Sequence, residues 1–373
     1  MNIVKKIRKA AFTYLPNVLK TTILRRAPAL FGIVEMNPTS CNIMITTRCN
    51  LKCVMCKQWR IKPGEELNTD EWKRVIGELY GYGIRNVHFT GGEPLLRSDL
   101  EDLIRYASGL GMVVGMTTNG ILIGEEKLTG MVGAGLASIA VSVDALGPGY
   151  EKIRGMQGSF SAIEKAVGAI SSVRRRLGID AYINFTLMRE SISALKSVKK
   201  FADKAGLPLG ICLLDKSSSI FDVAENKKTL WIDHESDSSE LAALREYLKS
   251  EMTRHPGSIL LSFSGIDYIS GYFKDPRQPG IPCAISQDRI FIDPYGGLFG
   301  GCLSMGTFGS LKDERIGALL ESDKYKAAKK RMFYKMCAGC SCGYMYNIRH
   351  MPGLLIGDLL KGAFLTGLRR GAR

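Results

Sequence analysis

Short apolar runs alternate with amphipathic stretches from about residue 40 to residue 215. Six runs have the length of strands, and they occupy residues 42–45, 86–89, 113–117, 137–143, 182–187 and 209–214. The stretches between them repeat apolar residues at helical spacing, as at Trp72, Val75 and Leu79. Six β–α units in series predict an α/β fold with a parallel sheet, and right-handed crossovers with all helices on one side would curl it into a partial (β/α)6 TIM-like barrel. A flat doubly wound sheet is the alternative, because periodicity does not separate the two.

The composition changes beyond the sixth run. Residues 216–257 form a polar linker followed by a helical pattern, whereas residues 258–348 are richer in Gly, Pro and aromatic residues and hold five cysteines. Two apolar runs around a Pro-Gly turn predict a hairpin over residues 289–299. We therefore expect a barrel core over residues 40–215 and a small C-terminal cysteine-rich domain, made of a hairpin plus helix, over residues 258–348.

The positive charge lies mostly at the two ends of the chain. Lys and Arg number 51 against 36 Asp and Glu, so the net charge is +15, and residues 1–39 and 349–373 hold more than half of it. Both segments have apolar residues at helical spacing with basic residues beside them, which predicts basic amphipathic helices. Such helices bind a membrane surface or an acidic partner, or they dock on the main body. Nucleic acid is not expected, since no stacking ladder or recognition motif is present.

The sequence contains no uncharged run long enough to span a bilayer. The apolar stretch near the N-terminus is broken by Pro16 and Asn17, unlike a secretory signal. We expect a cytoplasmic protein, located peripherally on the membrane if its ends bind lipid. In a reducing compartment, cysteines bind metals more often than they form disulfides.

Three cysteines directly follow the first predicted strand. Cys49, Cys53 and Cys56 have the spacing C-x3-C-x2-C, so one loop can direct three thiolates at one centre. A structural zinc site normally has four protein ligands, whereas three sulfurs suit a [4Fe–4S] cluster with one iron left open. Zinc with a distant fourth ligand, or three buried cysteines without a metal, are the alternatives.

This spacing resembles that of the radical S-adenosylmethionine (radical SAM) superfamily, and further motifs follow in the family's order. Gly91-Gly92-Glu93-Pro94 ends the second predicted strand and resembles the family's GGEP motif. Matches at the ends of the next two strands and just beyond are Asn119, Ser142, Asp144 and Arg154. The resemblance covers roughly residues 40–345, and it is specific for the superfamily rather than for a substrate.

The resemblance implies roles in binding SAM. The segment Gly91, Gly92, Glu93 and Pro94 would hold the amino group of its methionine part. Asn119, Ser142 and Asp144 would contribute polar contacts, those of Ser142 and Asp144 to the ribose and carboxylate, and Arg154 is a candidate contact to the SAM carboxylate. Met55 stands where the family often has an aromatic residue that stacks on adenine, and its thioether can make a similar contact.

A second group of cysteines lies in the C-terminal part. Cys283, Gly297 and Cys302 resemble the first half of the SPASM domain, a C-terminal extension of radical SAM enzymes. The second half departs from that pattern, because Tyr346 occupies the place of a later cysteine. The shorter twitch form, with one auxiliary [4Fe–4S] cluster, fits the ligands that are available: Cys283, Cys302, Cys337 and Cys340, with Cys342 as an alternative to Cys340. A zinc ribbon is the other interpretation.

The chemistry that the resemblance implies is reductive cleavage of SAM. A reductant such as flavodoxin or ferredoxin would supply the electron, and the 5′-deoxyadenosyl radical would abstract hydrogen from a substrate. The implied cofactors are two [4Fe–4S] clusters and SAM, with the auxiliary cluster relaying an electron. The catalytic proton donor and acceptor are unassigned. Asp293, Tyr295 and Tyr344 are candidates by position, and for Asp293 and Tyr295 a plain turn role is favoured.

Several substrates are compatible with these motifs. The basic amphipathic ends favour a lipid or another membrane-associated small molecule. The alternatives are a peptide- or protein-modifying maturase and a carbohydrate or aminoglycoside dehydrogenase. A non-catalytic iron–sulfur or zinc protein is a further alternative, but the Gly91–Pro94 segment argues against it, since an electron carrier needs no SAM site.

Overall fold

A single eight-stranded sheet forms the centre of the computed structural model, which describes residues 19–31, 33–34, 37–215, 230–277, 282–336 and 339–341. The strand order is β6-β5-β4-β3-β2-β1-β7-β8. The first six strands are mutually parallel, and each pairs with the next. They are β1 (Ser40–Met44), β2 (Asn86–Thr90), β3 (Val113–Thr118), β4 (Leu136–Ser142), β5 (Asp180–Leu187) and β6 (Leu209–Leu213).

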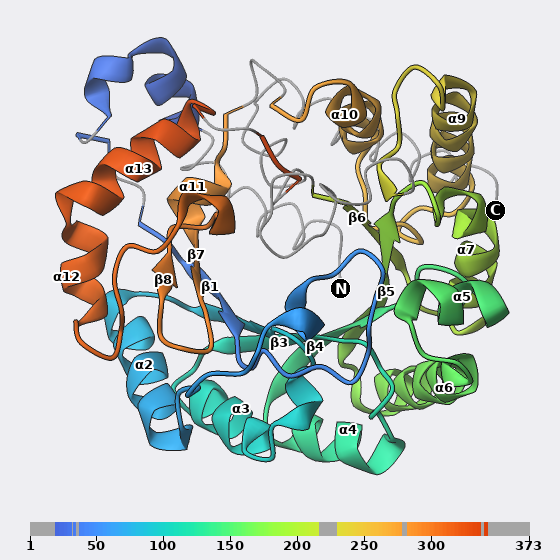
Figure 1. The fold of residues 1–373 in the computed structure, drawn as a ribbon, viewed down its shortest axis with the longest axis horizontal. Coiled ribbons are helices and arrows are strands. Elements are labelled where there is room, and N and C mark those ends of the chain that lie inside the picture. The colour runs from blue at the N-terminus through green and yellow to red at the C-terminus, as the bar shows by residue number, and fades with distance from the viewer. Residues whose placement is uncertain are drawn as a thin grey trace, which may run out of the picture.

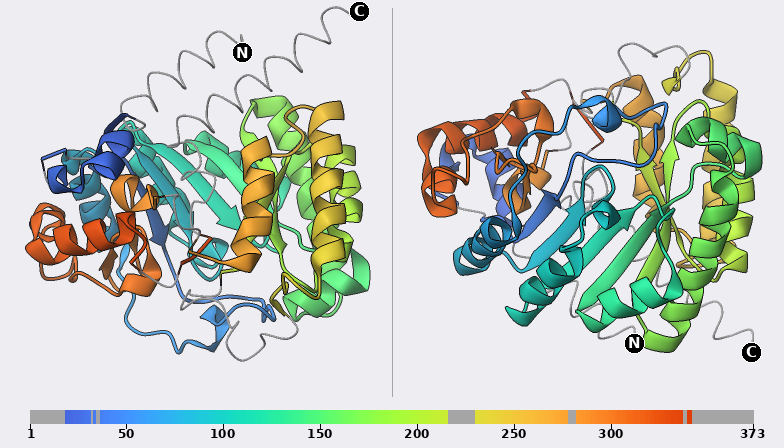
Figure 2. Two further views of the ribbon diagram at one scale, coloured as in Figure 1. Left: turned by 90° about the horizontal axis from the view of Figure 1, so that it is seen from above. Right: turned by 60° about the horizontal axis from the view of Figure 1, so that its bottom comes forward.

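The crossover helices lie along the outer, convex side of this curled sheet (Figures 1 and 2). They are α2 (Thr69–Tyr82), α3 (Leu100–Gly109), α4 (Glu125–Gly133), α6 (Ser159–Leu177) and α7 (Leu195–Lys204). Apolar side chains fill the layer between sheet and helices, and Ile43, Phe89 and Trp72 are completely buried there. The partial barrel is thus confirmed over the flat doubly wound sheet.

Helix α2 shows how local sequence fixes these elements. Its N-cap residue Asn68 accepts hydrogen bonds from the backbone of Asp70 and Glu71, and the Glu71 carboxylate bonds back to the Asn68 N–H at 2.8 Å. This capping box satisfies N–H groups that a helix start leaves unpaired. The helix ends at Gly83, whose φ of 112° is readily accessible only to glycine.

The predicted hairpin is present and extends the barrel sheet. Strands β7 (Arg289–Ile292) and β8 (Leu298–Phe299) are antiparallel to each other, while β7 pairs in parallel with β1. The short helix α11 (Ile285–Asp288) precedes β7, and α12 (Ile316–Glu321) and α13 (Asp323–Phe333) follow the hairpin. The C-terminal part therefore shares hydrogen bonds with the core.

Two further helices, α9 (Ser238–Arg254) and α10 (Phe263–Lys274), lie near the β6 side of the barrel (Figure 1). The short helix α5 (Gly147–Arg154) follows β4.

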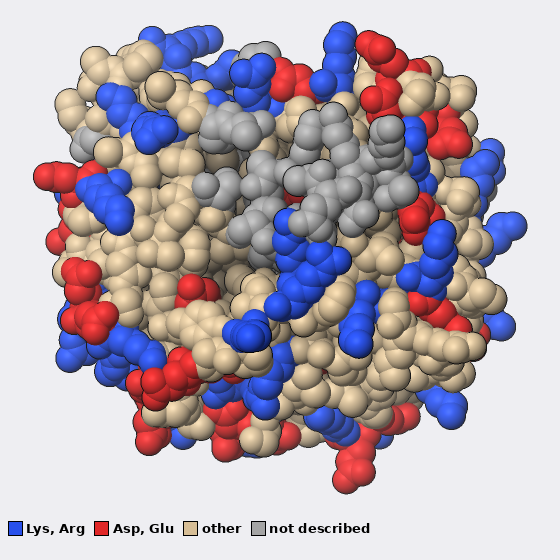
Figure 3. All heavy atoms as spheres, viewed as in Figure 1, with Lys and Arg blue, Asp and Glu red and all other residues tan. Residues whose placement is uncertain are grey.

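In the described part of the chain, no helix has both the length and the apolar character needed to cross a membrane. Basic and acidic side chains are interspersed around the rim of the face in Figure 3. Residues 1–18 of the predicted N-terminal amphipathic segment (1–39) and all of the predicted C-terminal segment (349–373) lie outside the described residues, as does most of the predicted linker.

Candidate functional site

The cysteine loop leaves the carboxyl end of β1. Cys53 is 8% exposed, and Cys49 and Cys56 are half-buried. Burial raises the pKa of the Cys56 thiol to about 12, and charge on Cys53 or Cys49 would raise it further, so the three sulfurs are electrostatic neighbours. Burial also raises the pKa of Cys49. Such thiols ionise at neutral pH only beside a strong positive centre, which a metal cluster provides.

The spacing of these sulfurs bears on the kind of metal. Across the described ranges, no three His, Cys, Asp or Glu side chains come close enough together to hold one metal ion. A cubane cluster binds each thiolate through a different iron, so its ligands stand further apart than those of a single ion. Three thiolates on one loop suit a [4Fe–4S] cluster that keeps one iron open.

The Gly91–Glu93 segment holds the cysteine loop from one side. The N–H groups of Gly92 and Glu93 donate to the carbonyl oxygens of Thr46 and Arg48, each at 2.8 Å. A Cβ atom at Gly91 would collide with the Thr46 carbonyl, and one at Gly92 with the Arg48 carbonyl. The two glycines are therefore needed for a close approach of two backbone segments. The sequence analysis associated them only with a ligand.

Helix α5 holds the loop from the other side. The N–H groups of Lys52 and Val54 donate to the carbonyls of Arg154 and Ile153, at 3.1 and 2.9 Å. These carbonyls belong to the last turn of the helix, where intrahelical partners are missing. Gly155 follows with a φ of 66°, and a Cβ there would meet the Lys52 carbonyl. The cysteine loop is thus fixed on both sides by backbone hydrogen bonds.

Glu93 connects the ends of β2 and β3. Its buried carboxylate accepts hydrogen bonds from Thr118 Oγ1 at 2.7 Å, from the Asn119 N–H at 2.8 Å and from the Leu95 N–H at 3.1 Å. Burial raises the pKa of Glu93, and the three hydrogen bonds oppose that shift. Asn119 in turn donates from Nδ2 to Asn50 Oδ1 in the cysteine loop at 2.7 Å. In this structure Glu93 and Asn119 position the loop.

Arg154 and Asp144 form a buried pair beside the cysteines. Arg154 Nη2 lies 2.6 Å from Asp144 Oδ2, and Arg154 Nη1 donates to Cys53 Sγ at 3.7 Å. Asp144 Oδ1 accepts the Thr186 N–H at 2.7 Å. Burial raises the pKa of Asp144, and the Arg154 charge opposes this.

Two donors beside this pair lack an acceptor. Arg154 is 6% exposed and its Nη2 is paired with Asp144, yet its Nε and the Tyr150 hydroxyl make no hydrogen bond with any described residue. Buried donors without acceptors are costly. A bound anionic group would satisfy them, and a carboxylate such as that of SAM has the right chemistry.

The other predicted SAM contacts lie at the same end of the barrel. Ser142 ends β4 and is partly exposed, and Pro94 is buried at the start of the turn that follows the glycines. Met55 is only 4% exposed and packs with the apolar core.

The C-terminal cysteines come from separate segments. Cys283 and Cys302 are buried on either side of the hairpin, and the Cys283 N–H donates to the Phe333 carbonyl at the end of α13. Cys340 precedes Ser341, whose hydroxyl donates to the Leu213 carbonyl at the end of β6 at 2.7 Å. Cys337 and Cys342 lie outside the described residues.

Two of the three candidates for proton transfer, Asp293 and Tyr295, belong to the hairpin turn. Asp293 accepts the N–H groups of Tyr295 and Gly297 at 2.9 and 2.8 Å, which is the turn role favoured for it. The Tyr295 hydroxyl accepts the Gly64 N–H at 3.2 Å and lies 3.5 Å from Thr47 Oγ1. Tyr344 lies outside the described residues.

Two carboxylates, the half-buried Glu66 and the buried Asp215, were not identified from the sequence. Glu66 Oε1 accepts the hydroxyls of Thr46 and Thr47 and the Thr47 N–H, at 2.9, 3.0 and 2.7 Å, and so anchors the start of the cysteine loop. No periodicity or spacing marks Glu66. Asp215 is 2% exposed just beyond β6 and acts electrostatically on Cys212. The strand-end rule that found Asp144 could also have found Asp215.

Comparison with known proteins identifies part of the chain. Residues 43–202 match the family model of the radical SAM superfamily. The PqqA peptide cyclase of Rhodopseudomonas palustris is 32% identical over 184 residues, which cover 46% of this chain and 44% of that protein. The Fe-coproporphyrin III synthase of Methanosarcina barkeri is 33% identical over 166 residues, covering 44% and 41%. These matches thus span less than half the length of either relative.

Solved structures share the fold. Streptococcus suis SuiB bound to S-adenosylmethionine superposes with a TM-score of 0.63 at 15% identity, over 86% of this chain and 77% of that one. Native anSMEcpe with bound AdoMet and a peptide gives 0.59 at 14% identity, over 90% and 100%. The family match, the cysteine loop and the barrel agree, and residues 43–202 are a radical SAM domain.

Proposed function

We propose that this protein is a radical SAM enzyme whose cluster is bound by Cys49, Cys53 and Cys56. The observation that carries this proposal is the buried Arg154, which bonds to Cys53 and whose Nε has no acceptor among the described residues. When bound, the [4Fe–4S] cluster supplies the electron that cleaves SAM into methionine and a 5′-deoxyadenosyl radical, which takes hydrogen from the substrate.

The chain's own residues would hold the reactants in place. Arg154 would offer its Nε to the SAM carboxylate while its Nη1 stays on Cys53 and its Nη2 on Asp144. Glu93 and Asn119 fix the strand end against the loop. Because these groups are buried, water is excluded and the geometry is set before SAM arrives, which favours one reactive orientation.

For the substrate, we propose a peptide or protein side chain rather than a lipid. The similar proteins include PqqA peptide cyclases and SuiB bound to its precursor peptide. No lipid-acting enzyme is among those described above, and the lipid prediction depended on the basic segments 1–39 and 349–373 alone. We further propose an auxiliary [4Fe–4S] cluster on Cys283, Cys302, Cys337 and Cys340.

The decisive test measures iron content and 5′-deoxyadenosine release after anaerobic reconstitution with SAM and dithionite. We expect about eight irons per chain and product from the unaltered protein, and about four irons and no product from Cys53→Ala. Cys41→Ala is the matched control, since Cys41 is a buried strand cysteine away from the loop. Product formation by Cys53→Ala would refute the proposal.

Two partners are proposed separately. A basic chain with a net charge of +15 suits an acidic one-electron donor such as flavodoxin or ferredoxin. Peripheral membrane contact through the terminal segments stays a prediction of the sequence. Flotation with anionic liposomes tests it, and a chain that stays at the bottom of the gradient would exclude it.

A further inference from the structure

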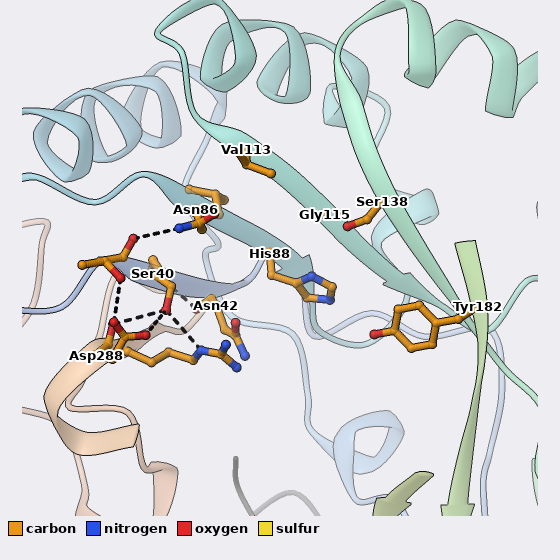
Figure 4. Close-up of a pocket in the computed structure, with 13 residues that line it drawn as sticks. Ser40, Asn42, Asn86, His88, Val113, Gly115, Ser138, Tyr182 and Asp288 are labelled. Carbon is orange, nitrogen blue, oxygen red and sulfur yellow. Dashed lines mark hydrogen bonds between the residues drawn. The ribbon is translucent and has the colours of Figure 1, made fainter. Parts of the chain in front are cut away.

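A cavity lies inside the barrel, at the end opposite the cysteine loop. Its volume is about 500 Å³, and residues that begin their strands line its mouth, among them Ser40, Asn86 and Val113 (Figure 4). The cysteine loop instead leaves β1 after Met44, at the carboxyl end. The cavity is therefore separate from the radical SAM site.

The inner face of the sheet is polar at this level. Strand pairing places Asn42 beside His88, His88 beside Gly115, and Gly115 beside Ser138, in one row across four strands. Barrels of parallel strands usually fill such layers with bulky branched apolar side chains. A row that contains no large aliphatic side chain does not form a packed core. It leaves space lined by hydrogen-bonding groups.

Several of these polar groups have no hydrogen-bond partner among the residues that the structure describes. Within the described residues, no hydrogen bond is made by the side chains of Asn42 and Ser138 or by the Tyr182 hydroxyl, although all three line the cavity. Figure 4 shows Asn42, His88 and Tyr182 directed into the same space. Such polar ends in a half-enclosed cavity are available to a ligand.

Arg289 supplies the positive charge of this cavity. Its Nε donates to Ser40 Oγ at 3.3 Å, and among the described residues its two Nη groups have neither a hydrogen bond nor an ion pair. The adjacent carboxylate, Asp288, is already engaged by Thr39 Oγ1 at 2.6 Å and by Ser40 Oγ at 3.3 Å. The guanidinium thus lines the cavity beside the Asp288 carboxylate, with its two Nη groups not bonded to any described residue.

His88 adds a neutral polar group. Its Nε2 lies 2.8 Å from Thr117 Oγ1, and burial and the Arg289 charge both lower its pKa, to about 4. A Cβ on Gly115 would come within 2.7 Å of both His88 Nδ1 and Ser138 Oγ. The glycine therefore makes room for the imidazole ring. At neutral pH the ring presents Nδ1 without a competing positive charge.

We propose that this cavity binds a small organic anion. Its carboxylate or phosphate group lies on the guanidinium of Arg289, and its polar groups meet Asn42, Ser138 and Tyr182. Arginine with hydroxyl and amide groups is a suitable donor set for such oxyanions. The volume is within the range of small-molecule sites, which is roughly 300–1,000 Å³. The proposal does not depend on the function proposed above.

Inorganic phosphate is the probe for the test, and the four histidines of the chain make NMR the readout. We expect phosphate to shift the imidazole signals of His88 saturably in the full chain, while those of exposed His255 stay in place. The His88 signals are assigned with His88→Gln. Arg289→Met should weaken the response about tenfold or more, since one charge-assisted hydrogen bond is lost.

Two further variants keep the outcome clear. Tyr182→Phe removes one hydroxyl from the cavity and should weaken phosphate binding by a smaller factor. Arg105→Met, at an exposed arginine of α3, should leave it unchanged. Thermal unfolding checks that each variant is folded. If Arg289→Met does not fold, the result for Tyr182→Phe decides the test. The proposal is overturned if phosphate does not shift the His88 signals, or if it shifts them as strongly in the cavity variants as in the unaltered chain.

Discussion

The two ends of the barrel are built in contrasting ways. At the carboxyl end, backbone hydrogen bonds from Gly92, Glu93, Lys52 and Val54 hold the cysteine loop. At the amino end, side chains such as Asn42 and Ser138 line an open cavity. A site that must position a reaction is fixed by backbone, which few substitutions can adjust. A site lined by side chains tolerates substitution and changes only what it binds.

The largest effect that we expect is from Gly92→Ala. The added Cβ would collide with the Arg48 carbonyl, which cannot move without displacing the cysteine loop. We expect loss of about half of the bound iron and of all 5′-deoxyadenosine release, measured by iron analysis and chromatography. Gly81→Ala on α2 is the control, because no atom lies within 4 Å of its added Cβ. Full iron loading of Gly92→Ala would contradict a backbone-fixed site.

Arg154→Met should come next. It leaves the buried Asp144 without its ion partner, and breaking such a pair costs about 3–5 kcal/mol of unfolding free energy. Affinity for SAM should also fall about tenfold or more, because donors to its carboxylate are lost. Thermal unfolding and calorimetric SAM titration measure the two effects.

The double variant Arg154→Met with Asp144→Asn separates stability from binding. Neutralising Asp144 removes the uncompensated charge, so stability should be largely recovered. SAM affinity should stay low, since the guanidinium is still missing. Recovery of SAM affinity in the double variant would show that Arg154 acts only on the fold.

Gly115→Ala tests the tolerance of the amino end. Its Cβ would meet the side chains of His88 and Ser138, which can rotate away, rather than backbone. We expect a loss of about 1 kcal/mol in stability, as for modest overpacking, with iron content and SAM cleavage unchanged. Loss of iron would mean that the two ends are coupled more strongly than the contrast implies.

The smallest effect that we expect is a change in how acid pH lowers the free energy of unfolding. Burial lowers the pKa of His88 to about 4 in the folded chain, against about 6.5 in an unfolded one. Between these values the unfolded chain binds more protons, so the free energy of unfolding falls as the pH drops from 6.5 to 4. His88→Gln should reduce this total loss of stability between pH 6.5 and 4 by about 1–3 kcal/mol in urea unfolding, while His255→Gln should not. An unchanged slope in His88→Gln would contradict a buried neutral imidazole.

The sequence predicted features that are local in the chain. Strand positions followed from apolar runs, and the cysteine loop and Gly91–Pro94 were found at strand ends because parallel strands present their loops at one edge. The pairing of β7 with β1 was not predictable, since a register such as Ser40 beside Arg289 depends on tertiary packing. Glu66 was missed for the same reason, because its threonine partners lie about twenty residues before it.

The roles of matched residues were harder to predict than their positions. Glu93 was expected at SAM, yet both of its carboxylate oxygens bond to the end of β3 and to Leu95. A motif shows that a residue is needed. It does not show which donors surround a buried carboxylate such as Glu93, and these donors decide what it binds. The terminal segments and Cys337 lie outside the described residues, so the predictions for them stand as predictions.

The strand order also has a consequence for solubility. Open sheet edges invite strands of other molecules and seed aggregation. Without the hairpin, β1 would be such an edge, but β7 covers it and leaves only the two-residue β8 outermost. At the opposite edge, Leu209 of β6 bonds to Ser258 and Leu260, and the carbonyl of Leu213 is taken by Ser341. The barrel thus offers little template at either edge for intermolecular pairing, and we expect truncation before residue 289 to cause aggregation.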